Sequence, residues 1–368
     1  MALSSINILF VLLLCFTVPV SCLERPKVAL FVFGDSLFDP GNNNYINTTT
    51  EHQANWWPYG ESFFKNPTGR ISDGRLIPDF IAEYANLPFV PSYFHFEHAQ
   101  SFHGVNFASG GAGCLVETYT GYVINLKMQV RYFKKVRKEL KKKLGVKEYK
   151  KLLSNAVYIF SIGNNDYLYP FASNSSIFYS YTQQKYTEMV IGNLTTVLKG
   201  IYKKGGRKFG ILNLAPLGCI PSVRAVSFLQ GDRSGKCVEK ITALAKMHNS
   251  LLPVKLKQLK KKLTGFHYTI FDLFNIANET INSPTKYGFK TATTACCGTG
   301  PFRGIDSCGG KRQVKEFQLC ENVKDYLFFD SIHPTEKAYN QFAKMFWDGA
   351  PEFIRPYNLK YLFQLSVT

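Results

Sequence analysis

The sequence lacks the short motifs that most often reveal what a chain does. It contains no Gly-x-Ser-x-Gly segment, which excludes the nucleophile elbow of α/β-hydrolases. It has neither a phosphate-binding loop nor a dinucleotide fingerprint. It also has no Cys-x-x-Cys pair, so a structural zinc site is not indicated. We therefore expect chemistry carried by side chains alone, with no metal and no cofactor.

Acidic residues are scarce. The chain has 26 Asp and Glu against 44 Lys and Arg, a net charge of +18. Much of the excess lies in two runs, residues 134–143 and 255–262, which predict solvated helix faces. Neither run has interleaved aromatic side chains, so we expect no nucleic-acid partner. Weak binding to an anionic polysaccharide or membrane surface is the alternative to plain solubility, and the oligomeric state stays open.

Long apolar runs are also few. Residues 8–16 form an apolar core that is too short to span a membrane. No Lys or Arg precedes Arg25, but the segment still predicts a signal peptide over residues 1–22, cleaved after Cys22. No later run reaches about 20 apolar residues, so we expect a secreted, extracellular protein. Four Asn-x-Ser/Thr sequons agree with that route and are candidates for glycosylation: Asn47, Asn174, Asn193 and Asn278.

The cysteines favour an oxidising compartment. Two of the nine lie in the leader or at its edge, and Cys219 with Cys237 forms a plausible bridge. Four more crowd into a glycine-rich stretch and predict a disulfide-stapled loop, with zinc as the weaker rival: Cys296, Cys297, Cys308 and Cys320. Their pairing does not follow from the sequence. The odd count after residue 22 leaves at least one thiol unpaired, and which one stays open.

Apolar runs alternate with amphipathic segments along the chain. The runs that predict strands are 28–33, 104–108, 156–162, 208–214 and 267–271. The segments that predict helices are 76–86, 126–144, 185–203, 238–263 with a kink at Pro253, and 336–347. This order predicts an α/β fold with a mostly parallel sheet of about five strands and helices on both faces. No Pro- or Ser-rich linker divides it, so we expect one domain over residues 23–368.

Three residues form a candidate nucleophilic site. Ser36 follows a buried strand by about three residues, where open α/β sheets place reactive groups, although a helix N-cap is the simpler explanation. Asp330 and His333 are three residues apart before Pro334, so the carboxylate can hold one imidazole nitrogen while the other points away. His333 could then take the Ser36 proton, although the pair could instead cap a helix.

Acyl transfer also needs donors for an oxyanion. The candidates are the backbone N–H groups of Ser36 and Gly110 and the side-chain amide of Asn165. Gly110 lies in the glycine turn 109–113 and could be replaced in this role by its neighbour Gly111. The alternative is that these residues only make turns.

Several ordered motifs resemble those of the plant GDSL esterase/lipases of the SGNH hydrolase superfamily. The similar segments are 33–44, 58–60, 67–70, 72–75, 105–113, 163–166, 295–298 and 330–336. The chain is most similar to the secreted subfamily linked with plant defence. The resemblance implies a three-layer α/β/α, flavodoxin-like SGNH-hydrolase fold and lipid-degrading esterase activity. It places the catalytic roles on Ser36, Gly110, Asn165 and His333, with Asp330 completing the triad.

These observations favour a secreted serine esterase that hydrolyses a lipid or small acyl ester through an acyl-enzyme. Two other functions remain open. An alcohol could intercept the acyl-enzyme, which would make the protein an acyltransferase. The chain could also be a catalytically idle protein that binds the cell wall through its basic faces. Acyl-chain and alcohol specificity depend on loop shapes that the sequence does not define.

Overall fold

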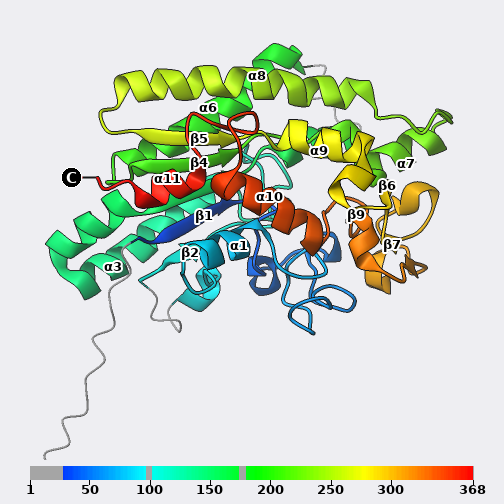
Figure 1. Cartoon of the computed structure of the whole chain (residues 1–368), viewed down its shortest axis with the longest axis horizontal. Helices are drawn as coiled ribbons and strands as arrows, with labels where there is room; N and C mark the ends of the chain where they lie inside the picture. Colours follow the sequence, from blue (N-terminus) through cyan, green and yellow to red (C-terminus); the bar gives the residue numbers. More distant parts are fainter. Residues whose placement is uncertain (1–27, 97–101, 174–179, 368) are drawn as a thin grey trace, which may run out of the picture.

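The computed structural model describes residues 28–96, 102–173 and 180–367 (Figure 1). The predicted signal peptide, with Cys15 and Cys22, and the sequon at Asn174 lie outside these residues. Within them, no helix is long and apolar enough to cross a membrane.

A six-stranded sheet forms the centre of the molecule, with strand order β10-β5-β4-β3-β1-β2. Its strands are β1 (Leu30–Gly34), β2 (Gly104–Asn106), β3 (Val157–Ser161), β4 (Lys208–Leu212), β5 (His267–Phe271) and β10 (Ile354–Arg355). The first five are parallel in the order 2-1-3-4-5, which is the flavodoxin-like arrangement. The predicted α/β fold with a mostly parallel sheet is therefore confirmed.

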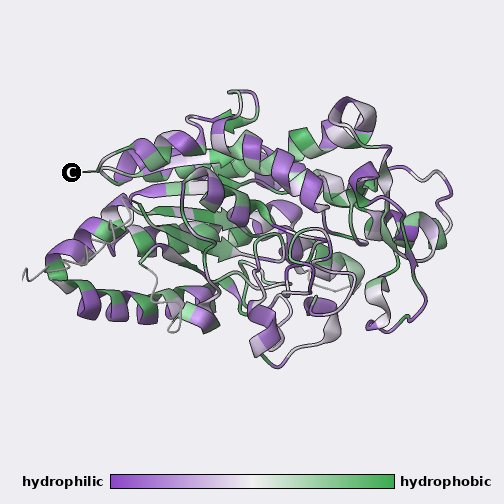
Figure 2. Cartoon of the chain, turned by 60° about the horizontal axis from the view of Figure 1, so that its bottom comes forward, coloured by the Kyte–Doolittle hydropathy of each residue, from purple (hydrophilic) through white to green (hydrophobic). Residues whose placement is uncertain are grey.

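The strands form because their side chains are apolar on both faces. Every residue of β1, β3 and β4 is buried, as expected for a parallel sheet covered by helices. In-register aromatic rings pack across the strands, with 5.4 Å between the ring centroids of Phe31 and Tyr158 and 5.5 Å between those of Tyr158 and Phe209. Figure 2 shows these hydrophobic strands at the centre and hydrophilic residues on the outer helices.

Helices cover both faces of the sheet, giving the three layers visible in Figure 1. One side carries α3 (Leu126–Asn155), α6 (Gln183–Tyr202) and α8 (Glu239–Lys262). The other carries α1 (Ile77–Tyr84), α10 (Glu336–Asp348) and α11 (Leu359–Gln364). The helices α4 (Asn164–Ala172), α7 (Pro221–Leu229) and α9 (Leu273–Asn282) begin soon after strands β3, β4 and β5 end.

The structure differs from the sequence prediction at a few boundaries. The first basic helix does not end near residue 144 but continues to Asn155 across a break at Gly145, whose φ is 74°. Pro253 lies inside α8, which is a single element from Glu239 to Lys262. The edge strand β10 was not predicted, because two residues give no periodic pattern.

Three disulfide bonds join six of the cysteines. Cys219–Cys237 pairs as predicted, and the glycine-rich loop holds Cys296–Cys320 and Cys297–Cys308. This loop contains two small sheets, β6 (Thr291–Ala295) with β9 (Tyr326–Phe328) and β7 (Cys297–Gly298) with β8 (Gln318–Leu319). Among the described residues Cys114 is the free cysteine. It is buried, and burial raises the pKa of its thiol well above the ordinary value.

The two basic runs lie on helix surfaces. On α3 and α8 the leucine and valine positions that face the core are buried while most lysines between them are exposed. Of the described sequons, Asn47 is exposed in an irregular segment, which suits a glycan. Asn193 and Asn278 lie within α6 and α9, and the Asn193 side chain donates a hydrogen bond to the carbonyl of Met189.

Candidate active site

Ser36 lies immediately beyond β1, at the point where the strand order reverses between β1 and β3. The side-chain amide of Gln129 pairs with both the N–H and the carbonyl of Gly34. The N–H of Asp35 donates to the carbonyl of Ser161 at 2.9 Å, and the Asp35 carboxylate accepts from Leu37 N–H at 3.1 Å. The turn that carries the serine is thus fixed on both sides, and Ser36 itself is 9% exposed.

Ser36, His333 and Asp330 lie together although Ser36 and His333 are 297 positions apart along the chain. Nε2 of His333 is 2.8 Å from Oγ of Ser36. Nδ1 of the same ring is 2.8 Å and 3.0 Å from the two carboxylate oxygens of Asp330. Asp330 and His333 are therefore arranged as their spacing predicts. The carboxylate holds one ring nitrogen, and the other points at the Ser36 hydroxyl.

The turn that holds Asp330 keeps this carboxylate charged. Its Oδ1 accepts hydrogen bonds from the backbone N–H groups of Ile332 at 2.9 Å and His333 at 2.7 Å. Burial opposes ionisation, but the charge and hydrogen bond of His333 and the charge of Arg312 outweigh it, lowering the pKa of Asp330 to about 2. A carboxylate that stays ionised can orient the imidazole and stabilise its protonated form.

Two residues beyond the predicted set support Asp330, one directly and the other through the first. The Tyr59 hydroxyl donates to Oδ2 of Asp330 at 2.9 Å, and Nη2 of Arg312 donates to the Tyr59 oxygen at 3.1 Å. Arg312 also pairs with Asp306 at 3.0 Å and lies over the Trp56 ring. Arg312 and Asp306 come from the disulfide-stapled loop, so that loop is joined to the site by hydrogen bonds.

This chain of contacts predicts a measurable role for Tyr59 as a positioning residue. Changing Tyr59 to Phe removes one hydrogen bond to a buried charge, and such a bond contributes about 1.5–3 kcal/mol, so we expect kcat to fall about 10- to 100-fold. The expected KM change is small, because Tyr59 touches His333 only through Asp330. Steady-state kinetics on a chromogenic ester would measure both, with the exposed Tyr361→Phe as the control. An unchanged kcat would show that Tyr59 does not position the triad.

The predicted oxyanion donors differ in how they are engaged. The N–H of Gly110 donates to the buried carboxylate of Asp39 at 2.8 Å. An oxyanion that bound this N–H would have to displace the carboxylate. Among the described residues, the N–H groups of Ser36 and Gly111 have no hydrogen-bond acceptor. The Asn165 amide donates to the carbonyl of Ala112 at 3.0 Å, which leaves its second N–H for a ligand.

The glycine turn is tied to the serine turn by asparagine side chains. Asn42 donates to the carbonyls of Asn106 and Ala108, and Asn43 donates to the carbonyl of Gly110. At Gly111 φ is +82°, and a Cβ would lie 2.7 Å from Nδ1 of His52, so only glycine fits this position. These contacts join the segments 33–44 and 105–113.

The two arginine motifs before α1 have a structural role. Arg70 makes a two-pronged ion pair with Asp79, whose carboxylate also accepts the N–H of Leu76 at the start of α1. Arg75 pairs with Glu336 at 2.6 Å, in the first turn of α10. Because α10 begins three residues after His333, these contacts hold the histidine turn against the rest of the domain.

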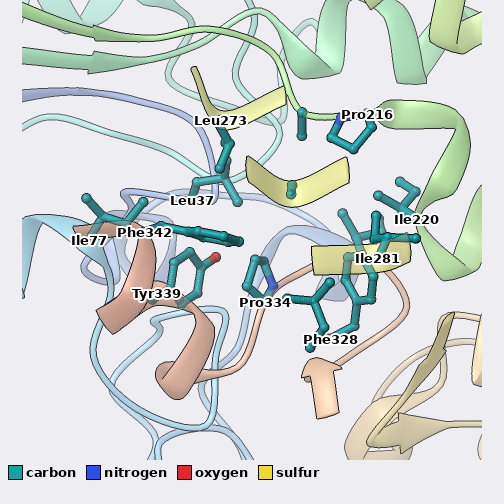
Figure 3. A pocket seen from close by; sticks show the side chains of 14 residues that line it. Leu37, Ile77, Pro216, Ile220, Leu273, Ile281, Phe328, Pro334, Tyr339 and Phe342 are labelled. Atoms are coloured by element: carbon teal, nitrogen blue, oxygen red, sulfur yellow. The ribbon is translucent and has the colours of Figure 1, made fainter. Parts of the chain in front are cut away.

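Beside the triad, an apolar pocket lies between α1, α9, α10 and β9 (Figure 3). Leu37, Ile332 and Pro334 line it, and these are the chain neighbours of Ser36 and His333. It is bounded on the other side by Pro216 and Ile220, which follow β4. By contrast, the described ranges contain no group of three His, Cys, Asp or Glu that could hold a metal ion.

Known proteins match the chain over most of its length. The sequence profile of the family described as GDSL-like lipase/acylhydrolase matches residues 30–346. GDSL esterase/lipase 1 of Arabidopsis thaliana is 50% identical over 355 residues, covering 94% of this chain and 94% of that protein. GDSL esterase/lipase 2 of the same plant is 51% identical over 341 residues, covering 92% and 90%. The GDSL lipase of Tanacetum cinerariifolium is 48% identical over 359 residues, covering 97% and 94%.

Proposed function

The chain belongs to the GDSL-like lipase/acylhydrolase family and is an esterase/lipase, a hydrolase of carboxylic esters, and from this premise we propose that Ser36, His333 and Asp330 form its catalytic triad. The observation that carries the proposal is the pair of contacts on the His333 ring, 2.8 Å to Ser36 Oγ and 2.8 Å to Asp330 Oδ1. A serine is a weak nucleophile unless a base takes its proton, and this arrangement provides that base.

In the first half of the reaction Ser36 Oγ attacks the ester carbonyl carbon while Nε2 of His333 takes the hydroxyl proton. The carbonyl oxygen becomes an oxyanion in a tetrahedral intermediate. The intermediate collapses as the bond to the alcohol oxygen breaks, and His333 gives that oxygen the proton. The alcohol leaves, and the acyl group remains on Ser36 as an ester.

In the second half water attacks the acyl-enzyme, with His333 again as the base. The bond to Ser36 Oγ breaks, the serine regains its proton from His333, and the carboxylic acid leaves. Asp330 keeps its charge throughout and stabilises the imidazolium that forms in each half. The net reaction is ester plus water giving acid plus alcohol, and no cofactor enters.

For the oxyanion we propose three donors: the backbone N–H of Ser36, the side chain of Asn165 and a backbone N–H of the glycine turn. Within the turn, Gly111 suits the role better than the predicted Gly110. The N–H of Gly110 is already given to Asp39, whereas that of Gly111 has no acceptor among the residues the structure describes.

The Asn165 role can be measured by removing its amide. Because losing one oxyanion donor typically lowers the rate about 100- to 1,000-fold, we expect Asn165→Ala to lower kcat by that factor with little change in KM. The matched control is Asn282→Ala, which changes an exposed asparagine at the end of α9. A kcat within threefold of the parent's would exclude Asn165 from the oxyanion site.

The hydrolase proposal is tested by offering the acyl-enzyme a second acceptor. The protein is incubated with p-nitrophenyl esters with and without a primary alcohol, and the products are separated. We expect free acid as the main product in both cases. A new ester as the main product would indicate an acyltransferase, and no turnover by the folded protein would favour a binding protein of the cell wall.

We also propose that the enzyme is secreted as a single domain over residues 23–368. Three disulfide bonds and an exposed sequon at Asn47 support an oxidising, extracellular destination. The exposed lysines of α3 and α8 would there face anionic polysaccharide or lipid headgroups, and any such binding would be weak and sensitive to salt.

A further inference from the structure

The apolar pocket begins directly at the catalytic residues. Leu37, Ile332 and Pro334 are half-buried at its edge, and each is the immediate neighbour of Ser36 or His333 in the chain. Behind them the wall is formed by buried side chains of α1, α9 and α10, namely Ile77, Leu273, Ala277, Ile281, Tyr339 and Phe342. The cavity between them measures about 50 Å³.

One polar atom of this wall has no partner. Tyr339 is completely buried, and its phenol oxygen makes no hydrogen bond to any residue that the structure describes. Figure 3 shows that oxygen directed into the pocket between Phe342 and Pro334. Burial and the nearby carboxylates of Asp330 and Asp35 raise the pKa of Tyr339 well above its ordinary value. The group therefore stays a neutral hydrogen-bond donor.

An unpartnered hydroxyl is unfavourable in an apolar wall, since burial removes its bonds to water without replacing them. Packing alone does not require a hydroxyl group at position 339. Phe342, one turn further along α10, lines the same pocket with a plain phenyl ring. A buried donor aimed into an apolar space is instead the arrangement by which binding pockets recognise one polar atom of an otherwise apolar ligand.

We propose that this pocket binds the acyl part of the ester, and that the preferred acyl group is a hydrocarbon carrying one oxygen atom that accepts a hydrogen bond from Tyr339. This inference rests on the proposed role of Ser36. The acyl group is assigned to the pocket rather than the alcohol because it stays in the site after the alcohol leaves, held on Ser36 until water releases it. The alcohol must leave and water must enter, so its side needs access to solvent.

The test compares two substrates that differ only in that oxygen. These are p-nitrophenyl hexanoate and p-nitrophenyl 5-oxohexanoate, each rate being divided by the spontaneous hydrolysis of the same ester. For the parent enzyme we expect kcat/KM to favour the oxo ester by about tenfold, since a pocket built around a hydrogen bond disfavours a ligand that lacks it. In Tyr339→Phe the ratio of kcat/KM for the oxo ester to that for the hexanoate should fall to about one. The control Tyr202→Phe, whose hydroxyl bonds the Thr264 carbonyl, should keep the parent's ratio.

Thermal unfolding separates a binding role from a structural one. Because the Tyr339 hydroxyl has no partner in the fold, Tyr339→Phe should have a melting temperature equal to or above the parent's. A lower melting temperature together with an unchanged preference would mean that the hydroxyl serves the fold, which would overturn the proposal.

A second variant tests which part of the ester enters the pocket. Ala277→Phe places a ring in the space, so the ratio of kcat/KM for p-nitrophenyl hexanoate to that for the acetate should fall at least about tenfold. If hexyl acetate were affected instead, the pocket would hold the alcohol and the proposal would be wrong. Turnover by the parent without any oxo preference would also overturn it, while leaving the triad intact. Absence of turnover with every ester would contradict the proposed function itself.

Discussion

Replacing Ser36 by alanine is expected to lower kcat for ester hydrolysis by about 10⁶-fold, the loss seen when a serine nucleophile is removed from a complete triad. We expect the acyl-enzyme to form on Ser36, because its Oγ lies 2.8 Å from His333 Nε2. Initial rates on a chromogenic ester would measure the loss. The rate that remains would reflect binding and the oxyanion donors alone.

The control for this variant is Ser154→Ala, which changes a serine on α3 whose hydroxyl bonds only the Lys151 carbonyl. Both variants should melt within a few degrees of the parent. If Ser36→Ala kept more than a tenth of the parent activity while Ser154→Ala behaved normally, the nucleophile would have to be another residue.

Replacing Asp330 by asparagine is expected to lower kcat by about 10⁴-fold, because an amide cannot hold the imidazole in the tautomer that accepts the Ser36 proton. The amide also removes the negative charge that stabilises the imidazolium. The substitution also removes the charge of Asp330 from the surroundings of the Arg312 cation, which remains paired with Asp306. The kinetic loss should appear in kcat and leave KM nearly unchanged.

Asp348→Asn is the matched control, since Asp348 lies at the end of α10 and pairs with exposed Lys344. It should keep the parent's kcat. A small loss in Asp330→Asn, comparable with the control, would mean that His333 is oriented by other contacts, and the account of the triad would need revision.

Much of the fold could be predicted because its elements have strong local patterns. The strands β1, β3, β4 and β5 are short apolar runs bounded by glycine or polar residues, and each was placed within about two residues of its observed bounds. The first basic helix was predicted to end at residue 144, next to the break at Gly145. Its continuation to Asn155 was missed, because a glycine after the last periodic residue is a typical helix end. The pairing of Cys296 with Cys320 and of Cys297 with Cys308 depends on how the loop folds back on itself, which local patterns do not reveal.

The site was predictable to the extent that its residues follow strand ends. Ser36 and the Asp330–His333 pair lie in turns, and Asn165 lies in the first turn of α4, where polar side chains stand out from the apolar runs. Tyr59 lies in an irregular segment with no periodic pattern. Its contact with Asp330 spans 271 residues, so no spacing could indicate it. Arg312 is one of 44 basic residues, and only its burial distinguishes it from the surface charges.

The choice between Gly110 and Gly111 shows the same limit at finer scale. Both glycines satisfy the need for a backbone that a ligand can approach closely. What distinguishes them is the Asp39 carboxylate, which lies on the serine turn and takes the N–H of Gly110. The difference between the two glycines arises because the serine turn and the glycine turn meet in space, which neither local sequence reveals.

The most direct test of the central claim is covalent labelling with a fluorophosphonate, read by peptide mass spectrometry. The serine oxygen attacks phosphorus and fluoride leaves, so the label marks an activated serine without any knowledge of the substrate. The account predicts label on the peptide that contains Ser36, and loss of that label in His333→Ala. Label on a different serine, or no label on the folded protein, would contradict it.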